Sequence, residues 1–420
     1  MLLIKNARLC GETSGSADIL VENGKIAAIS EKIEETAEMA VINSTGLVVA
    51  PGLVDMLVHF RDPGFEYKED ILTGAAAAAA GGVTTCCCMP NTSPAADSVE
   101  TVKYIVNKSK DALIKVLPYG AVTVGQKGDE LTDFVALKVV GAVAMSDDGY
   151  SIQSAEQMRL ALRSARDFGL FISSHCEDSD LAKNYAVNEG KVSRELGLLG
   201  RPAIAEDIMV CRDIMLAAET DARLHIAHVS TAASVEIIRL AKAAGVKVTA
   251  ETCPHYFSLT EDEVLTQGSM ARVNPPLRTT NDVEAIIIGI IDGTIDAIAT
   301  DHAPHSEQEK SLPLAEAPSG MIGLETSLPV ALTFLYHTGR LGLEGIITLM
   351  STNPARILGI DAGTLLVGAP ADIVIFDPDE EWTVRPDDFK SKARNTPFSG
   401  MKLKGKVKYT ISDGVIVFRE

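Results

Sequence analysis

The stretch RLHIAHVSTAASVEIIRLAKAAGVKVTAETCPHYF, residues 223–257, decides the fold. It opens on a short apolar run, RLHIAHVS (223–230), and closes on a second one, VKVTAETCPHYF (246–257). Between them, AASVEIIRLAKAAG (232–245) carries Ala, Leu and charged residues at helical spacing and ends on Gly. Strand, helix and strand in this order predict a βαβ unit, and therefore an α/β fold with parallel strands.

The same rhythm continues on both sides of this stretch. Apolar runs of strand length alternate with helix-like stretches such as DILTGAAAAAAGG (70–82) and IAEDIMVCRDIMLAAET (204–220). Eight such runs within about 270 residues predict a (β/α)8 TIM barrel. A doubly wound sheet is the alternative, but the sequence contains no GxGxxG motif and no P-loop. The runs are 47–60, 82–90, 114–124, 139–148, 169–178, 223–230, 246–257 and 295–304.

Both ends of the chain show a different pattern, of short strands and tight turns. ADILVENGKIAAIS (17–30) consists of two apolar runs joined through Asn-Gly, the strongest short-range signal for a hairpin. Residues 371–384 and 406–420 have the same character around Asp-Pro and Asp-Gly turns. We therefore expect residues 1–50 and 360–420 to form one small β-sandwich domain beside a barrel of residues 51–359.

The amino-acid composition excludes some classes of binding partner. The 420 residues include 38 basic and 57 acidic side chains, for a net charge of −19, and 46% are apolar. The acidic balance argues against binding to nucleic acid or to anionic membranes, so an anionic substrate would need local cations in its site. No apolar run approaches the roughly 20 residues of a membrane helix. The start of the chain also lacks a signal-peptide core, and we expect a cytoplasmic protein.

The seven cysteines fit a reducing compartment better than a disulfide framework. Cys86, Cys87 and Cys88 are consecutive. On a strand their side chains alternate between the two faces, so they cannot hold one metal ion together. We expect them to be small buried residues.

Metal-binding residue types collect at the C-terminal ends of the expected barrel strands, which is where such a barrel carries its active site. A single strand-end histidine is more often a structural residue, but five ligand-type residues on separate strands, all in phase, predict a divalent-metal site. Imidazole nitrogen and carboxylate oxygen suit zinc, which lowers the pKa of bound water. The five residues are His59, Asp148, His175, His228 and Asp301.

Other polar residues of the same loops describe a pocket. Arg61 faces the same side of its strand as His59, and Asn91 ends the next strand. Asn274 and His305 come from later loops. Because an Arg fork suits a carboxylate and an Asn suits an amide edge, these residues predict a small ligand that bears both groups. Of the remaining histidines, His225 is interpreted as structural, His255 as structural or as a support for a ligand residue, and His337 is given no role.

Short motifs along the whole chain resemble those of bacterial dihydroorotase, in the class with an aspartate rather than a carboxylated lysine between its metals. The wider amidohydrolase superfamily shares a metal-bearing barrel with a β-sandwich from both termini. The combination of HFRDPG (59–64), MPNT (89–92) and TDHAPH (300–305) is more specific. Further matching motifs are SDDG (146–149), SSHCED (173–178), HIAHVST (225–231), TAETCPHYF (249–257), NPPLR (274–278), APSGMIGLET (317–326) and NTPFSGMKLKGKV (395–407).

The resemblance implies a role for each metal-binding residue. His59 would bind a first metal and Asp148 would bridge, while His175 and His228 would hold a second metal. Asp301 would bind the first metal and act as general base and acid. One or two zinc ions are therefore expected per chain.

The resemblance also implies how the substrate is held. Three side chains would bind its carboxylate, Asn274 would contact the ring amide, and backbone at Ser319 and Gly320 would close over it. The carboxylate-binding side chains would be Arg61, Asn91 and His305.

One position departs from the family pattern Asp-x-His-x-His-x-Arg. The chain reads Asp55-Met-Leu57-Val-His59-Phe-Arg61, so Leu57 stands where the first histidine ligand belongs. Leucine offers no lone pair, and the first metal keeps only His59, Asp148 and Asp301. The sequence leaves three outcomes open: one firmly held metal, a water in the gap, or loss of catalysis.

Three functions remain as hypotheses. The leading one is dihydroorotase: metal-dependent, reversible cyclisation of N-carbamoyl-L-aspartate to L-dihydroorotate in pyrimidine synthesis, by an enzyme expected to be a homodimer. The second, which rests on Leu57, is a catalytically impaired subunit that scaffolds aspartate transcarbamoylase. The third is a related hydantoinase or allantoinase, although those families usually carry a lysine near the fourth strand, where this chain has Met145-Ser146.

Overall fold

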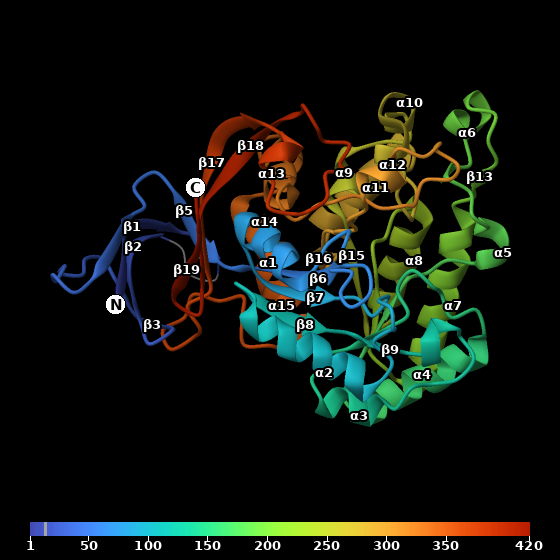
Figure 1. Cartoon of the computed structure of the whole chain (residues 1–420), viewed down its shortest axis with the longest axis horizontal. Coiled ribbons are helices and arrows are strands. Elements are labelled where there is room, and N and C mark those ends of the chain that lie inside the picture. Colours follow the sequence, from blue (N-terminus) through green and yellow to red (C-terminus); the bar gives the residue numbers. More distant parts are fainter. Residues whose placement is uncertain (12–14) are drawn as a thin grey trace.

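A ring of parallel strands forms the centre of the molecule (Figure 1), whose computed structural model describes residues 1–11 and 15–420. One ladder joins β6, β7 and β8, and a second joins β9, β10, β11, β14, β15 and β16. β8 and β9 follow each other directly and share one position in the ring. The strands are β6 (Leu53–Val58), β7 (Val83–Cys88), β8 (Lys115–Pro118), β9 (Gly120–Ala121), β10 (Met145–Ser146), β11 (Ile172–Ser174), β14 (Leu224–Ile226), β15 (Val248–Thr252) and β16 (Ala297–Ile298).

Backbone hydrogen bonds close the ring between the two ladders. The Tyr119 N–H donates to the Cys88 carbonyl at 2.9 Å, between β7 and the β8–β9 position. On the other side, the His59 N–H donates to the His302 carbonyl at 2.8 Å, just beyond the ends of β6 and β16. The eight predicted apolar runs therefore occupy the eight positions of a (β/α)8 barrel, which confirms the predicted fold.

The helices cover the outside of the ring (Figure 1). In α4 the buried residues Met158, Ala161, Leu162 and Ala165 follow the spacing of a helix face. The longer helices are α1 (Ile71–Ala80), α2 (Val99–Lys108), α3 (Phe134–Val139), α4 (Ala155–Asp167), α7 (Ile204–Thr220), α8 (Ala232–Ala243), α11 (Thr280–Ile291) and α15 (Asn353–Leu358).

Short helices and turns fill the connections. Those of four or five residues are α5 (Ser179–Ala182), α6 (Lys191–Glu195), α9 (Pro254–Ser258), α10 (Glu263–Gln267), α12 (Glu307–Lys310), α13 (Ser327–Ala331) and α14 (Leu343–Ile347). The remaining helical turns are η1 (Ser109–Asp111), η2 (Val124–Gln126), η3 (Gly268–Ala271), η4 (Leu332–Tyr336), η5 (Thr348–Thr352) and η6 (Pro386–Asp388). A two-stranded ribbon, β12 (Val187–Asn188) with β13 (Gly200–Arg201), lies between β11 and α7.

The alanine-rich helix α1 packs unusually close to the barrel. A Cβ placed on Gly74 would lie 2.4 Å from the Phe60 ring, and one on Gly81 would lie 2.1 Å from the Leu324 carbonyl oxygen. Small residues are therefore required on this face, and the run from Ala75 to Ala80 is a packed helix.

Strands from both termini pair in one sheet, in the order β19-β18-β17-β5-β1-β2-β3, with β4 beside β1. The predicted hairpin joins β2 to β3, and Asn23 and Gly24 take the positive φ values, 51° and 76°, that its tight turn needs. The strands are β1 (Leu2–Leu9), β2 (Gly15–Glu22), β3 (Lys25–Ser30), β4 (Ala40–Asn43), β5 (Val48–Pro51), β17 (Ile373–Thr383), β18 (Lys402–Ser412) and β19 (Val415–Arg419).

The terminal sheet and the barrel share part of one hydrophobic core. Val48 of β5, Phe376 of β17 and Val407 of β18 belong to the same buried cluster as Val83 of the barrel. Inside the ring, a separate cluster contains Cys87, whereas Cys86 and Cys88 face the shared outer core. All seven cysteines are free, and no helix within 1–11 and 15–420 is long and apolar enough to cross a membrane.

Candidate metal centre and active site

The predicted metal-binding residues meet at the C-terminal mouth of the barrel, and each comes from a different strand position. Asp148 links two groups, since its Oδ1 lies 3.4 Å from His228 Nε2 and its Oδ2 lies 3.3 Å from His59 Nε2. His59 Nε2 also lies 3.0 Å from Asp301 Oδ1. His175 Nδ1 completes the cluster, 2.7 Å from His228 Nε2.

Asp148, His175 and His228 have the geometry of a cation site. Their ligand atoms lie 2.7, 3.4 and 3.8 Å apart. A zinc ion about 2.0–2.1 Å from each ligand holds its ligands roughly 3.3 Å apart in a tetrahedron. All three residues are buried, and Asp148 Oδ1 has no hydrogen-bond partner in the described chain. The three donors therefore fit a divalent cation.

The charges in this cluster are already arranged for a cation. Burial by itself would raise the pKa of Asp148, but the neighbouring imidazoles of His228, His59 and His175 outweigh it and lower that pKa. Burial likewise opposes charge on His228, yet Asp148 raises the His228 pKa to about 9. The carboxylate is thus held ionised among imidazoles, and a metal ion binding there displaces a proton.

The first metal site, expected at His59, Asp148 and Asp301, lacks one of its ligands. His59 Nδ1 donates to Asn91 Oδ1 at 2.9 Å, which turns Nε2 toward Asp301 and Asp148. Leu57 is fully buried and belongs to the apolar cluster inside the barrel. It offers no ligand atom, and among the described residues the one cluster with metal-site geometry is Asp148–His175–His228.

Three residues at the mouth adopt backbone conformations that non-glycine residues rarely take. Arg61, His228 and Asp301 have φ values of 62°, 37° and 49°. Each lies just past the end of a barrel strand. Left-handed backbone at such residues costs free energy and is typical of functional sites, where it aims a side chain that an extended strand would point elsewhere.

The residues expected to hold the carboxylate lie over β6 and β16. Arg61 donates through Nε to the Pro304 carbonyl at 3.3 Å, and its Nη2 lies 3.5 Å from His305 Nε2. His305 Nε2–H donates to the Ser319 carbonyl at 2.8 Å. Burial, with the charges of Arg61 and Lys68, lowers the pKa of His305 to about 2, so its imidazole is neutral.

Gly320 lies against Ala303 and His305 on this side of the barrel mouth, where no larger residue fits. Its φ is 133°, and a Cβ there would lie 2.7 Å from Ala303 and 3.1 Å from His305 Nε2. Lys310, which sequence reasoning missed, is buried beneath this loop and donates to the Pro318 and Gly320 carbonyls at 3.0 Å. It fixes the segment that contains Ser319.

Asn274 lies at the opposite side of the mouth. Its Nδ2 is 3.4 Å from both His175 Nε2 and Glu177 Oε2, and its Oδ1 accepts from Arg201 Nη1. Together with Lys183 and neighbouring residues, these side chains line a cavity of about 350 Å³. Sequence reasoning missed Glu177 and Arg201; the only available signal was that SSHCED places an acid two residues past a predicted ligand.

The remaining histidines lie outside the cluster. His225 is buried inside the barrel, with Nδ1 2.8 Å from Thr249 Oγ1 and Nε2 3.3 Å from Glu251. His255 is buried beside Tyr256, and burial lowers its pKa to about 4. His302 Nδ1 accepts from the Gly323 N–H at 3.2 Å. His337 contacts the Pro378 carbonyl, far along the chain from these residues.

Comparisons with known proteins show which family the chain is similar to. A family profile described as Dihydro-orotase-like matches residues 46–234, and one described as Amidohydrolase family matches residues 320–418. A dihydroorotase from Acetivibrio thermocellus is 52% identical over 97% of this chain and 96% of its own length. Another, from Clostridioides difficile, is 48% identical over 100% of both chains.

Solved structures share the fold. L-hydantoinase (dihydropyrimidinase) from Arthrobacter aurescens superposes with a TM-score of 0.89 at 28% sequence identity, over 100% of this chain and 96% of that one. That structure supports the barrel with a terminal β-sandwich, whereas the higher identity lies with the dihydroorotases. The chain therefore belongs to the dihydroorotase family of the amidohydrolase superfamily.

Proposed function

We propose that this chain interconverts L-dihydroorotate and N-carbamoyl-L-aspartate, in the ring-forming direction during pyrimidine synthesis. One observation carries the proposal: full-length identity of about half to dihydroorotases coincides with a buried Asp148–His175–His228 cluster at the barrel mouth. The enzyme is thus a metal-dependent cyclic amide hydrolase.

We propose zinc as the metal, with one firmly held ion per chain. The donor set of two imidazoles and a carboxylate suits zinc and leaves a position for water. A divalent cation bound there supplies Lewis acidity and lowers the pKa of its water. The first site retains His59, Asp148 and Asp301, and because Leu57 is apolar and buried it holds an ion far more weakly, or none.

Asp301 is proposed as the proton carrier. Its carboxylate is buried at the mouth, and Oδ1 is held by His59 Nε2 at 3.0 Å. In hydrolysis, Asp301 accepts a proton from the attacking water and returns it to the ring nitrogen when the amide bond breaks. In cyclisation the same carboxyl removes a proton from the attacking ureido nitrogen and protonates the departing hydroxyl group.

The substrate carboxylate is proposed to lie between Arg61, Asn91 and His305. Asn91 Oδ1 already accepts from His59, which leaves its Nδ2 donors for the ligand. Arg61 supplies positive charge, and neutral His305 supplies shape and a fixed ring. Asn274 is proposed to contact the ring amide, and the backbone at Ser319 and Gly320 to cover it.

One observation, Leu57, favours a second function, a scaffold subunit for aspartate transcarbamoylase. The rest of the site favours an enzyme, because the other residues proposed to bind metal and substrate are present and lie around the barrel mouth. Light scattering distinguishes the proposed homodimer from a chain that assembles only with a partner. Hydantoinase activity is less favoured, because identity is 28% to a hydantoinase and 52% to a dihydroorotase.

Turnover of L-dihydroorotate by the zinc-loaded protein tests the proposal, with hydantoin as the comparison substrate. We expect ring opening of dihydroorotate and little of hydantoin. A zinc-loaded, folded protein that opens neither ring, even with Leu57→His, would support the scaffold.

A further inference from the structure

Arg201 is a buried cation at the mouth of the barrel that none of the proposed roles uses. It ends β13, which pairs with β12 in the excursion between β11 and α7. Its side chain is only 6% exposed, and it lines the same cavity as Asn274 and the proposed metal ligand His175. Moving the charge of a guanidinium out of water costs free energy, so a buried Arg is expected to make contacts that offset this cost.

The hydrogen-bonding capacity of Arg201 is only partly used. Nη1 donates to Glu177 Oε1 at 2.9 Å and to Asn274 Oδ1. Nε is buried and has no hydrogen-bond partner among the described residues. Because buried donors in native proteins are nearly always paired, this N–H calls for an acceptor that arrives from the cavity.

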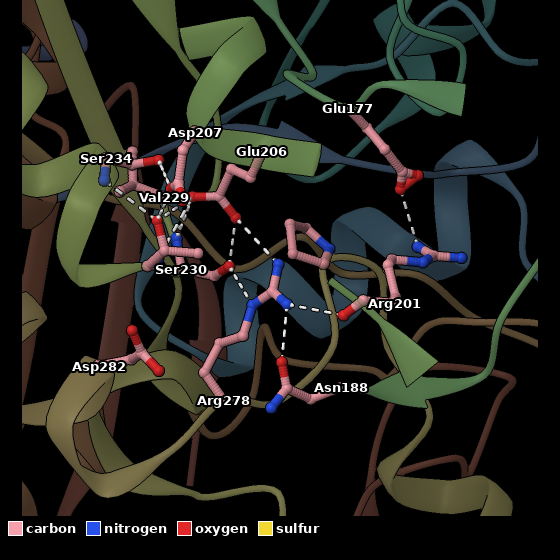
Figure 2. A network of polar contacts seen from close by, with 12 residues as sticks. Glu177, Asn188, Arg201, Glu206, Asp207, Val229, Ser230, Ser234, Arg278 and Asp282 are labelled. Atoms are coloured by element: carbon pink, nitrogen blue, oxygen red, sulfur yellow. Dashed lines mark hydrogen bonds and ion pairs between the residues drawn. The ribbon is translucent and has the colours of Figure 1, made fainter. Parts of the chain in front are cut away.

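The backbone of Arg201 is anchored firmly (Figure 2). Arg278 Nη1 donates to the Arg201 carbonyl at 3.3 Å and to Asn188 Oδ1 at 2.8 Å. Arg278 Nη2 also pairs with Glu206 at 3.5 Å, and Glu206 accepts from the Ser230 N–H at 3.0 Å, two residues past His228. One buried ion pair thus ties Arg201 to the loop of a proposed metal ligand, so its position is fixed before a ligand binds.

Arg201 lies across the mouth from the carboxylate-binding residues. β11 is four positions from β6 in either direction around the ring, and Glu177, which holds Arg201, follows β11. Arg61 follows β6. A ring whose carboxylate is held at Arg61 therefore turns its opposite edge, where the urea carbonyl and the cleaved amide carbonyl flank a ring nitrogen, toward Arg201 and Asn274.

We propose that Arg201 is a specificity-determining residue that donates to the urea carbonyl of the substrate, the carbonyl that does not belong to the cleaved amide. This inference rests on the proposed function. Glu177 and Asn274 hold the guanidinium through Nη1, which leaves its Nε–H unpaired. The carbonyl supplies the missing acceptor, and the desolvated Arg gains a charge-assisted hydrogen bond.

Calorimetric titration with orotate tests this role without requiring turnover, because orotate carries both the carboxylate and the urea carbonyl. We expect Arg201→Met to weaken orotate binding roughly 10- to 100-fold, and Arg201→Lys to fall between. The KM for dihydroorotate should rise in parallel, with less effect on kcat. Arg163→Met, a matched change on the exposed face of α4, should leave the affinity unchanged.

The outcomes separate this inference from the function on which it rests. One outcome is that the wild type turns over dihydroorotate while Arg201→Met binds both zinc and orotate as the wild type does. That result overturns the role of Arg201 and leaves the proposed function intact. Loss of bound zinc in both Arg201 variants would show a purely structural role and overturns it also. If the wild-type protein neither binds orotate nor opens dihydroorotate, both proposals fail.

Discussion

At the scale of single residues, strand-end position was the informative signal. His59, Asp148 and His228 could be placed from sequence because parallel strands bring their C-terminal ends to one mouth. Arg201 could not, because it lies in a 29-residue excursion between β11 and α7 whose path no periodicity specifies. The hydrogen bond from His59 to Asn91 could not be predicted from the sequence either, because it depends on a side-chain rotation rather than on spacing.

The first prediction concerns Asp301. Asp301→Asn removes the proton acceptor while keeping the shape of the side chain, so kcat for dihydroorotate hydrolysis should fall roughly 10²- to 10⁴-fold. Zinc content should stay near that of the wild type, because the Asp148–His175–His228 cluster is untouched.

Asp180→Asn is the matched control, since this carboxylate on α5 is 96% exposed. Its activity should equal that of the wild type. Full activity in Asp301→Asn would remove Asp301 from proton transfer.

At the scale of elements, most helices and strands followed from periodicity and turn residues, as the Asn23-Gly24 hairpin and the α4 face show. Close approaches between elements did not follow, because they depend on three-dimensional packing. The contact of Gly74 with Phe60 is one example.

The second prediction tests that contact. Gly74→Ala should destabilise the protein by about 1–3 kcal/mol through overpacking, although alanine favours a helix by roughly 0.5–1 kcal/mol over glycine. Thermal unfolding measures the difference. Ala76→Gly in the same helix is the comparison, and it should cost only about 1 kcal/mol through lost helix propensity. A Gly74→Ala protein as stable as the wild type would contradict the close packing of α1.

The third prediction concerns the loop contact made by Glu325, which accepts from the Lys390 and Ser391 N–H groups at 2.9 and 3.1 Å. Burial raises the pKa of Glu325 from 4.5 to about 7. The folded protein therefore binds more protons than the unfolded chain between these pH values, and the free energy of unfolding falls as pH rises through that window.

Glu325→Gln should remove this fall in the free energy of unfolding at high pH, because Gln does not ionise. Its side-chain oxygen still offers an acceptor for both N–H groups. We expect a higher Tm than the wild type at pH 8 and a much smaller difference at pH 5, measured by thermal unfolding in matched buffers. A Tm difference that is the same at both pH values would show that ionisation of Glu325 is not its cause.

At the scale of the whole molecule, the terminal sheet and the barrel are joined by shared core residues, including Val48, Phe376 and Val407. The fourth prediction is that both parts unfold in a single calorimetric transition, because exposing one part also exposes the core of the other. Two resolved transitions in the zinc-loaded protein would contradict this coupling.

The shared cation also belongs to the scale of the whole molecule, because it requires side chains that follow three separate strands, β10, β11 and β14, to bind one ion. Zinc per chain, measured by elemental analysis after extensive dialysis, tests it most directly in the wild type and in Leu57→His. We predict about one zinc per chain in the wild type and up to a second in Leu57→His, because the added imidazole completes the first ligand set. A wild-type protein that retains two zinc ions, or none, would contradict the account.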